Sequence, residues 1–225
     1  MNTRPVVRLT GVSKSFSMPG APPIAVLNGV DFTLQPGEKA SLTGPSGSGK
    51  STLLALIAGL LEPDSGTVEV GGESLASRSE YQRAEVRART TGIALQSDNL
   101  IPFLSARENV ELALGFGSDV TRRRAPTVAR ELLERFGVGH RADHVPRHLS
   151  GGEAQRVALA VAIANRPAVL LADEVVAQLD AETAARVIDE VLTVDIAVLY
   201  ITHDVALADR VTTRYELVDH RVRPR

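Results

Sequence analysis

The stretch Gly44-Pro45-Ser46-Gly47-Ser48-Gly49-Lys50-Ser51 follows the pattern G-x-x-x-x-G-K-[ST]. A short strand-like run at 39–43 precedes it, and an apolar helical run at 52–58 follows it. Strand, glycine-rich loop and helix in this order are the context in which such a motif binds phosphate. The stretch therefore predicts a phosphate-binding P-loop at the centre of an α/β fold.

The residue types of this loop suit a nucleoside triphosphate. Its glycines let successive backbone N–H groups turn onto one phosphate, and the positive end of the following helix faces the same anion. Lys50 can reach the β- and γ-phosphates, and the Ser51 hydroxyl can ligate Mg²⁺. A glycine-rich turn that carries a lysine by chance is the alternative, and the match of all eight positions in context argues against it. We expect the nucleotide to contact Gly44, Pro45, Ser46, Gly47, Ser48, Gly49, Lys50, Ser51 and Thr52.

Composition places the chain among globular proteins and excludes several other classes. Of its 225 residues, 44% are hydrophobic and 23% are charged, which is enough apolar material for a substantial core. A formal net charge of −2 gives no overall basic field for nucleic acid. Without cysteine the chain has neither a disulfide nor a thiolate metal site. It also lacks a signal peptide's apolar core and the roughly 20 uninterrupted apolar residues of a membrane span.

Hydrophobic patterning predicts strands in alternation with helices. Continuous apolar runs at 168–172 and 197–201 are typical of parallel strands buried on both faces. From about 104 to 149 the pattern becomes helical, most clearly at 122–136. The whole chain, 1–225, is therefore expected to be one α/β nucleotide-binding domain with a helical insertion at roughly 97–149. Further strands are expected at 6–10, 24–34 with a turn at Asn28-Gly29, 66–72, 92–96 and 213–222.

Two acids directly follow the apolar run at 168–172. Asp173 and Glu174 would lie at the carboxyl end of a parallel strand, where open α/β sheets bind their ligands. In a chain with a P-loop, Asp173 would hold Mg²⁺ and Glu174 would polarise the attacking water as general base. A strand-terminal acidic turn without a chemical role is the alternative.

The run Leu149-Ser150-Gly151-Gly152-Glu153 precedes an apolar-rich helix expected to begin near Ala154. Ser150 and Glu153 fit the S-x-x-E capping box, in which each side chain bonds a backbone N–H of the other. The pair Gly151-Gly152 is unusual in a first helical turn, because glycine weakens helices. Two positions without side chains at a helix N-terminus would let a further phosphate approach the backbone.

Together these runs resemble the ATPase subunits of ABC transporters. The 149–153 run is the most specific part of the resemblance, because P-loops occur in many NTPase families. The resemblance implies a P-loop NTPase fold with a RecA-like core, an antiparallel β subdomain and the helical insertion. It spans nearly the whole chain, and its motifs stand in the family's order: the loop 44–51, Gln96, the 149–153 run, Asp173-Glu174, Leu179-Asp180 and His203.

In this family two subunits pair head to tail, and each ATP lies between the P-loop of one subunit and the LSGGE run of the other. The resemblance therefore implies a second ATPase subunit as a partner, either a copy of this chain or a related one. The residues that would contact the partner's nucleotide are Ser150, Gly151, Gly152 and Glu153.

The resemblance also assigns roles to three isolated residues. Phe16 stands at the adenine-stacking position, where tyrosine is commoner, although a core aromatic is the alternative. Gln96 would touch Mg²⁺ and the attacking water and would couple to the membrane partner. His203 would contact the γ-phosphate. The implied Mg²⁺ ligands are thus Ser51, Gln96 and Asp173, and the implied catalytic residues are Glu174, His203, Gln96 and Lys50.

The chain departs from the family after Asp173-Glu174, where Pro-Thr is usual and Val175-Val176 stands instead. The loss of proline frees a fixed φ, and valines are bulky. No catalytic side chain is lost, so we expect hydrolysis to survive at an altered rate. A clamp that binds ATP without hydrolysing it is the alternative that this departure raises.

Ala172 and the segments at 99–102 and 108–110 look like the lipoprotein-release and macrolide-export group of the family. That likeness implies an ATPase on the cytoplasmic face of the membrane that powers a separate integral membrane permease. Two alternatives remain open, an importer ATPase for small solutes and a soluble ABC ATPase that moves no solute. The soluble ABC ATPase is the less expected of the two, because this chain has a single ATPase domain, no long heptad repeat and no cysteine. No nucleic-acid partner is expected.

Overall fold

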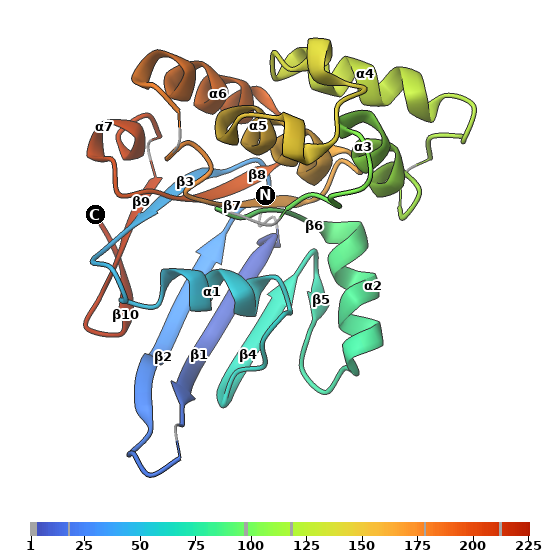
Figure 1. Ribbon diagram of the computed structural model, residues 1–225. Coiled ribbons are helices and arrows are strands. Elements are labelled where there is room, and N and C mark those ends of the chain that lie inside the picture. Colours follow the sequence, from blue (N-terminus) through green and yellow to red (C-terminus); the bar gives the residue numbers. More distant parts are fainter. Residues whose placement is uncertain (1–3, 18, 97–98, 118, 178, 212) are drawn as a thin grey trace.

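The computed structural model describes residues 4–225 apart from 18, 97–98, 118, 178 and 212, and it contains two β-sheets and a layer of helices (Figure 1). The larger sheet has the strand order β10-β9-β3-β8-β7-β6. Neighbouring strands in it are parallel except β9 and β10, which form an antiparallel hairpin. The carboxyl ends of β3, β8, β7 and β6 therefore share one edge of the sheet. Its strands are β3 (Lys39–Thr43), β6 (Thr91–Ala94), β7 (Val169–Asp173), β8 (Ala197–Ile201), β9 (Thr213–Val218) and β10 (Arg221–Pro224).

Strands β7 and β8 are buried on both faces, as their unbroken apolar runs predicted. Because successive side chains of a strand point to opposite faces, each strand contributes to two separate clusters. Val169 and Leu171 pack in the cluster that includes helix α1 and the smaller sheet. Leu170 and Ala172 pack in the cluster that includes α5 and α6. The larger sheet is thus the middle layer of the molecule.

The smaller sheet is antiparallel and has the order β2-β1-β4-β5. The predicted turn at Asn28-Gly29 is wrong, because β2 continues through both residues. The pairing of β1 with β2 shifts register near these residues, and Gly29 adopts a φ of 59°. The strands are β1 (Val7–Phe16), β2 (Ile24–Leu34), β4 (Ser65–Val70) and β5 (Glu73–Ser74).

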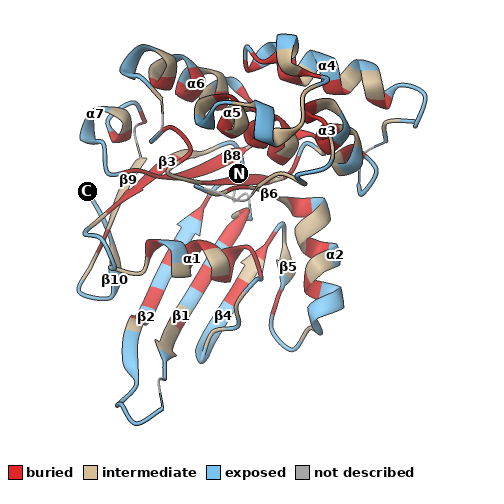
Figure 2. Cartoon of the chain, viewed as in Figure 1, coloured by how far each residue is buried: buried red, intermediate tan, exposed pale blue. Residues whose placement is uncertain are grey.

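Helix α1 packs between the two sheets, whereas α3, α4, α5 and α6 cover the other face of the larger sheet (Figure 1). Figure 2 shows that the buried faces of these helices turn toward the sheet. Residues 97–98 of the expected insertion lie outside the described residues. The helices are α1 (Lys50–Ile57), α2 (Glu80–Thr90), α3 (Ala106–Leu114), α4 (Ala125–Arg135), α5 (Gly151–Ile163), α6 (Ala181–Thr193) and α7 (Val205–Ala208), with single 3₁₀ turns at Gly139–Arg141 and Pro146–His148.

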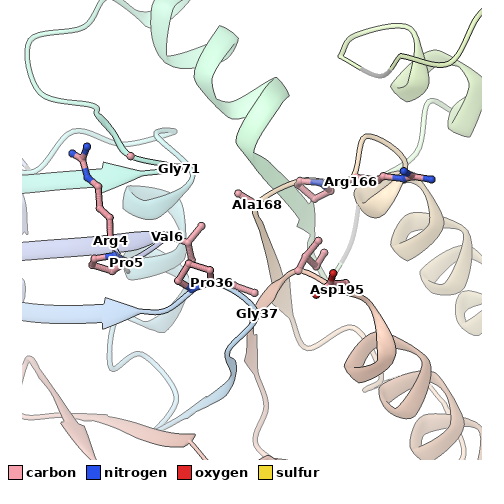
Figure 3. A pocket seen from close by; sticks show the side chains of 13 residues that line it. Arg4, Pro5, Val6, Pro36, Gly37, Gly71, Arg166, Ala168 and Asp195 are labelled. Atoms are coloured by element: carbon pink, nitrogen blue, oxygen red, sulfur yellow. The ribbon is translucent and has the colours of Figure 1, made fainter. Parts of the chain in front are cut away.

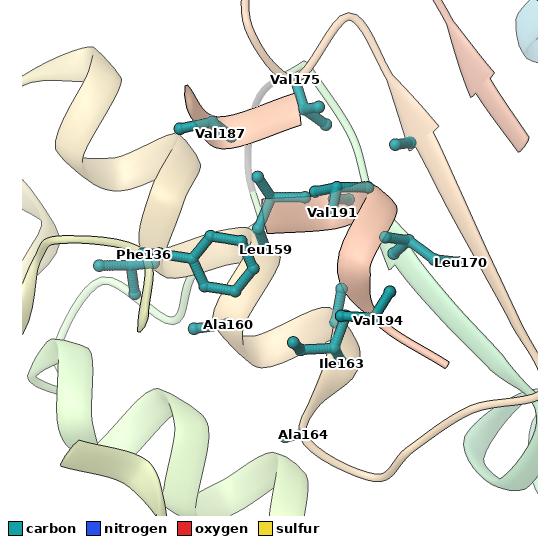
Figure 4. Packing of buried hydrophobic residues seen from close by; sticks show 14 of the residues in the cluster. Phe136, Leu159, Ala160, Ile163, Ala164, Leu170, Val175, Val187, Val191 and Val194 are labelled. Carbon is teal, nitrogen blue, oxygen red and sulfur yellow. The ribbon is translucent and has the colours of Figure 1, made fainter. Parts of the chain in front are cut away.

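One apolar cluster fixes α5 and α6 against the larger sheet (Figure 4). Phe136, which follows α4, packs with Leu159 of α5, and Val187 and Val191 of α6 close the cluster. All four side chains are at most 4% exposed. Burial of each such side chain contributes roughly 1.5–3 kcal/mol. The cluster therefore holds the N-terminus of α5 in a defined position relative to the sheet edge.

Candidate active site

The loop 44–51 leaves β3 and enters α1, which is the strand–loop–helix context expected of it. Gly44, Gly47 and Gly49 have φ values of 146°, 74° and 104°, in the region that favours glycine. A Cβ on Gly44 would lie 2.4 Å from the carbonyl oxygen of Leu217, and a Cβ on Gly49 would lie 2.6 Å from a valine side chain. Backbone conformation and close neighbours therefore both require glycine at these two positions.

Lys50 begins α1, and its ammonium group folds back over the loop. Nζ donates hydrogen bonds of 2.9 Å to the carbonyl oxygens of Gly44 and Pro45, and the residue is only 6% exposed. Burial lowers the pKa of Lys50, while the charges of Glu174 and Asp173 act in the opposite direction. The positive charge is thus fixed at the loop, within electrostatic reach of both acids.

The hydroxyl of Ser48 also fits an anion site. Its Oγ is buried and has no hydrogen-bond partner within the part of the chain that the structure describes. Leaving a buried hydroxyl unpaired costs free energy, and a phosphate oxygen would supply an acceptor. The neighbouring residues Pro45, Ser46 and Gly47 are exposed, so a ligand can reach the loop from solvent.

Ser51 and Asp173 come together although 122 positions separate them in the chain. The Ser51 hydroxyl donates a hydrogen bond of 2.8 Å to Oδ2 of Asp173. Asp173 ends β7, and β8 alone separates that strand from β3 and its P-loop. Hydroxyl and carboxylate oxygens are the donors that Mg²⁺ prefers, so this pair fits a Mg²⁺ site.

Glu174 and His203 form a second pair at the same sheet edge. Nε2 of His203 lies 2.7 Å from Oε1 of Glu174. Glu174 follows the end of β7, and His203 follows the end of the neighbouring strand β8. A carboxylate held by an imidazole next to the P-loop can accept a proton and can hold a water by hydrogen bonding.

The backbone at Glu174 is strained and held in place. Its φ of 49° is left-handed, which costs roughly 1–3 kcal/mol for a residue other than glycine. Its N–H donates to Ile201 O at 3.1 Å. The two residues that follow, Val175 and Val176, are 2% and 7% exposed and belong to the core next to α5 and α6. Burial of each valine contributes about 1.5–3 kcal/mol, which offsets the strain. The two valines therefore anchor the segment that carries Glu174.

Gln96 and Phe16 lie in exposed positions. Gln96 follows β6 at the same edge of the sheet as Asp173, and its carbonyl oxygen accepts a hydrogen bond of 2.5 Å from Nε2 of Gln155. Phe16 ends β1 and is 42% exposed, with Nζ of Lys14 5.8 Å from the ring centroid. The core-aromatic alternative for Phe16 is therefore wrong, and its ring remains accessible for stacking.

The capping box at Ser150 and Glu153 is confirmed. The Ser150 N–H donates to Glu153 Oε2 at 2.7 Å, and the Glu153 N–H donates to Ser150 Oγ at 3.2 Å. Nε of Arg141 also donates to Glu153 Oε1 at 2.7 Å. Among the described residues, no hydrogen bond from this turn reaches the loop 44–51. The glycine-bearing start of α5 is thus built independently of the chain's own P-loop.

The capping box predicts an acid-dependent loss of stability. The backbone N–H of Ser150 and the guanidinium of Arg141 lower the pKa of Glu153 to about 2 from the ordinary 4.5. A folded-state pKa below the unfolded value means that the carboxylate stabilises the fold above pH 4.5 and loses this effect as the pH falls toward 2. In urea unfolding at pH 7, 4.5 and 3, Glu153→Gln should therefore lose less stability on acidification than the parent. Glu131→Gln on the exposed side of α4 should behave as the parent, and identical pH dependence in all three proteins would contradict this role.

A hollow of about 530 Å³ opens at the opposite end of the parallel strands (Figure 3). It is lined by Arg4, Arg166 and Asp195 and by the residues that precede β3, β7 and β8. Neither the loop 44–51 nor the two acids at 173–174 line it. The groups that suit phosphate chemistry therefore lie at the carboxyl edge of the sheet and not in this hollow.

Two residues of the site were missed by sequence reasoning. Gln155 anchors the backbone at Gln96, and a glutamine inside an amphipathic helix gives no signal of that contact. Asp204 caps α7 by accepting from the N–H groups of Ala206 and Leu207, which fixes the chain just after His203. An Asp before a short apolar run is a helix-cap signal that could have identified it.

The sequence of this chain is similar to those of known ABC transporter ATP-binding proteins. The sequence model of the ABC transporter family matches residues 27–177. A lipoprotein-releasing system ATP-binding protein, LolD 1 of Rhodopirellula baltica, is 42% identical over 217 residues, which cover 92% of each chain. LolD 2 of Caulobacter vibrioides is 45% identical over 91% of this chain and 90% of its own. An uncharacterised ABC transporter ATP-binding protein of Escherichia coli, YbbA, is 42% identical over 95% of each chain.

Solved structures agree with the sequence relatives. The dimeric ATP-binding cassette MJ0796, in a post-hydrolysis state with ADP and Pi, superposes with a TM-score of 0.92 at 34% identity, covering 97% of each chain. The expected P-loop NTPase fold is thereby confirmed. Among the described residues, none of the helices combines the length and apolarity that a bilayer crossing requires. The chain therefore belongs to the ABC transporter family and is an ATPase subunit of that family.

Proposed function

We propose that this chain hydrolyses ATP at the cytoplasmic face of the membrane to drive a separate integral membrane permease of the lipoprotein-releasing type. The observation that carries the proposal is the meeting of two pairs, Ser51–Asp173 and Glu174–His203, beside the P-loop. The relatives named LolD support the lipoprotein-release assignment over solute import.

Each pair has a separate role in the proposed reaction. Oε1 or Oε2 of Glu174 accepts the proton of the water that attacks the γ-phosphate. His203 orients that carboxylate and contacts the γ-phosphate. Lys50 and the backbone N–H groups of the loop bind the β- and γ-phosphates, and Phe16 stacks on the adenine.

Ser51 and Asp173 would hold Mg²⁺, together with Gln96 at the same sheet edge. The 2.8 Å contact between the first two shows oxygen donors already gathered at one point. When bound, Mg²⁺ neutralises the charge that develops on the phosphate oxygens. The residues of this chain bind the phosphates, orient the attacking water and accept its proton.

The second half of the nucleotide site comes from another ATPase subunit. Ser150 and Gly151 are exposed at the start of α5, and their hydrogen bonds stay within that region of the chain. The backbone N–H groups of such a helix start attract anions. We infer that the run 150–153 contacts ATP bound by the partner subunit, and that the two copies close head to tail on two nucleotides.

The permease is proposed to meet the side of the molecule formed by α2, α3 and the residues from 99 onward that lead into α3. Three large aromatic side chains there are strongly exposed: Tyr81 on α2, Phe103 before α3 and Phe116 after α3, at 73%, 78% and 68%. Aromatic side chains are enriched in protein–protein interfaces, which is the basis for this assignment. Helix α2 leads directly into β6, and Gln96 follows the other end of that strand (Figure 1).

Lys50→Ala should abolish measurable ATP binding at micromolar nucleotide. The change removes the charge that faces the phosphates and leaves two loop carbonyls without their donor. Binding is measured by equilibrium dialysis or by fluorescence of a nucleotide analogue with Mg²⁺ present.

Lys39→Ala is the matched control. Its Nζ also donates to two carbonyl oxygens, those of Val194 and Ile196, but it lies at the other end of β3. This variant should lose stability and keep ATP affinity. Equal ATP affinity in Lys50→Ala and the parent would overturn the assignment of the loop.

Reconstitution tests the transport assignment. The chain is purified together with its permease, placed in vesicles and supplied with a fluorescent lipid-modified protein. We expect release of that protein to require ATP and to stop with Glu174→Gln. Stimulation of turnover by a small solute, with no release of the lipid-modified protein, would favour an importer instead.

A further inference from the structure

Gln155 is a buried polar residue that the proposed reaction does not use directly. It lies in the second turn of α5 and is 4% exposed. Its Nε2 donates a hydrogen bond of 2.5 Å to the carbonyl oxygen of Gln96, 59 positions away in the chain. Its Oε1 is buried and has no partner within the described residues.

The amide at this position is not explained by stability. A buried Oε1 without a partner costs free energy, and an apolar side chain of the same length would avoid that cost. The contact that Nε2 makes is therefore the feature that requires a glutamine. Gln155 thereby holds the backbone of Gln96, the residue proposed to contact Mg²⁺ and the attacking water.

Helix α5 contacts β6, the strand that leads to Gln96, and Gln155 extends this contact to Gln96 itself. Along β6, a Cβ on Gly92 would lie 2.2 Å from Ala162 O, so strand and helix touch backbone to backbone. Beyond the strand, the Asn99 side chain bonds both the N–H and the carbonyl of Leu95, at 2.7 and 2.6 Å. The backbone is thus fixed around Gln96, while its side chain is exposed.

We propose that Gln155 is a positioning residue that ties Gln96 to α5, so that Gln96 and the exposed turn 150–153 keep one relative geometry. The inference rests on the role proposed above for Gln96. The first turn of α5 contacts the nucleotide bound by the partner subunit. The second turn of α5 contacts the backbone of Gln96, which serves the nucleotide bound by this chain. Displacement of a catalytic-site loop by about 1 Å costs up to roughly a hundredfold in rate.

Gln155→Met tests this at nearly constant side-chain length. We expect kcat for ATP hydrolysis to fall roughly 10- to 100-fold, with KM for ATP within about twofold of the parent. Asn165→Leu is the matched control. Asn165 follows α5, donates Nδ2 to Ala113 O at 2.8 Å, and likewise has a buried Oδ1 without a partner among the described residues. Each variant removes one hydrogen bond together with one unpaired buried oxygen, so neither should lower the melting temperature substantially, and only Gln155→Met should lower kcat.

A second measurement separates positioning from general destabilisation. Gln96→Ala is combined with Gln155→Met, and the changes in kcat are compared by a double-mutant cycle. If Gln155 acts through Gln96, its replacement should have little further effect once the Gln96 side chain is gone. Additive losses of kcat, or parental kcat in Gln155→Met, would overturn the positioning role of Gln155 and leave the proposed function intact. A parent without any turnover would overturn the proposed role of Gln96 as well.

Discussion

Glu174→Gln should lower ATP turnover roughly 100- to 10,000-fold while ATP still binds. The substitution keeps size and hydrogen-bonding capacity but removes the charge and the basicity needed to take a proton from water. Phosphate binding depends on Lys50 and the loop backbone, which this change does not touch. The His203 contact, 2.7 Å in the parent, survives as a hydrogen bond to an amide.

Steady-state phosphate release and nucleotide binding are measured side by side. Glu131→Gln on α4 is the control and should keep parental turnover. Near-parental turnover in Glu174→Gln would remove Glu174 as the base. Loss of ATP binding would instead make its role structural, because the strained backbone at this residue depends on neighbouring contacts.

Gly151→Asp should abolish turnover and leave ATP binding to the monomer nearly unchanged. The new carboxylate would stand in the first turn of α5, against the γ-phosphate of the partner's nucleotide, where charge repulsion prevents closure. The chain's own P-loop makes no hydrogen bond to this turn among the described residues, so its affinity for ATP should persist. Turnover and monomer affinity are again the two readouts.

Thr127→Asp is the control for Gly151→Asp. It places a carboxylate in the exposed first turn of α4, where an acid suits the helix dipole and no nucleotide is expected. Turnover should stay at the parental level. If Gly151→Asp also turned over ATP normally, the run 150–153 would have no part in the site.

The sequence predicted those parts of the site that depend on short local patterns. The loop 44–51, the capping box of α5 and the acids after β7 each combine residue type with local context, and the structure brings Ser51 within 2.8 Å of Asp173. Unbroken apolar runs also identified β7 and β8, because a strand buried on both faces leaves no polar positions.

Features that depend on distant contacts were beyond sequence reasoning. Helix α2 has mixed polar residues and was not predicted, yet it is held by a capping box at Ser79 and by ion pairs of Arg83 with Glu62 and Glu80. The turn expected at Asn28-Gly29 gave way to a continuous strand, because bulges in the pairing with β1 accommodate the glycine. The left-handed φ of Glu174 and the anchor at Gln155 arise only once the sheet and α5 are packed together.

We expect ATP to be held between two copies of this chain, or between this chain and a related subunit. Gel filtration with light scattering on the Glu174→Gln protein measures whether this pairing forms. With ATP and Mg²⁺ we expect about twice the monomer mass of 24.0 kDa, and the monomer mass with ADP or after addition of Gly151→Asp to the same chain. A Glu174→Gln protein that binds ATP tightly and yet keeps the monomer mass, alone and with its permease present, would show that the nucleotide is not shared between two subunits.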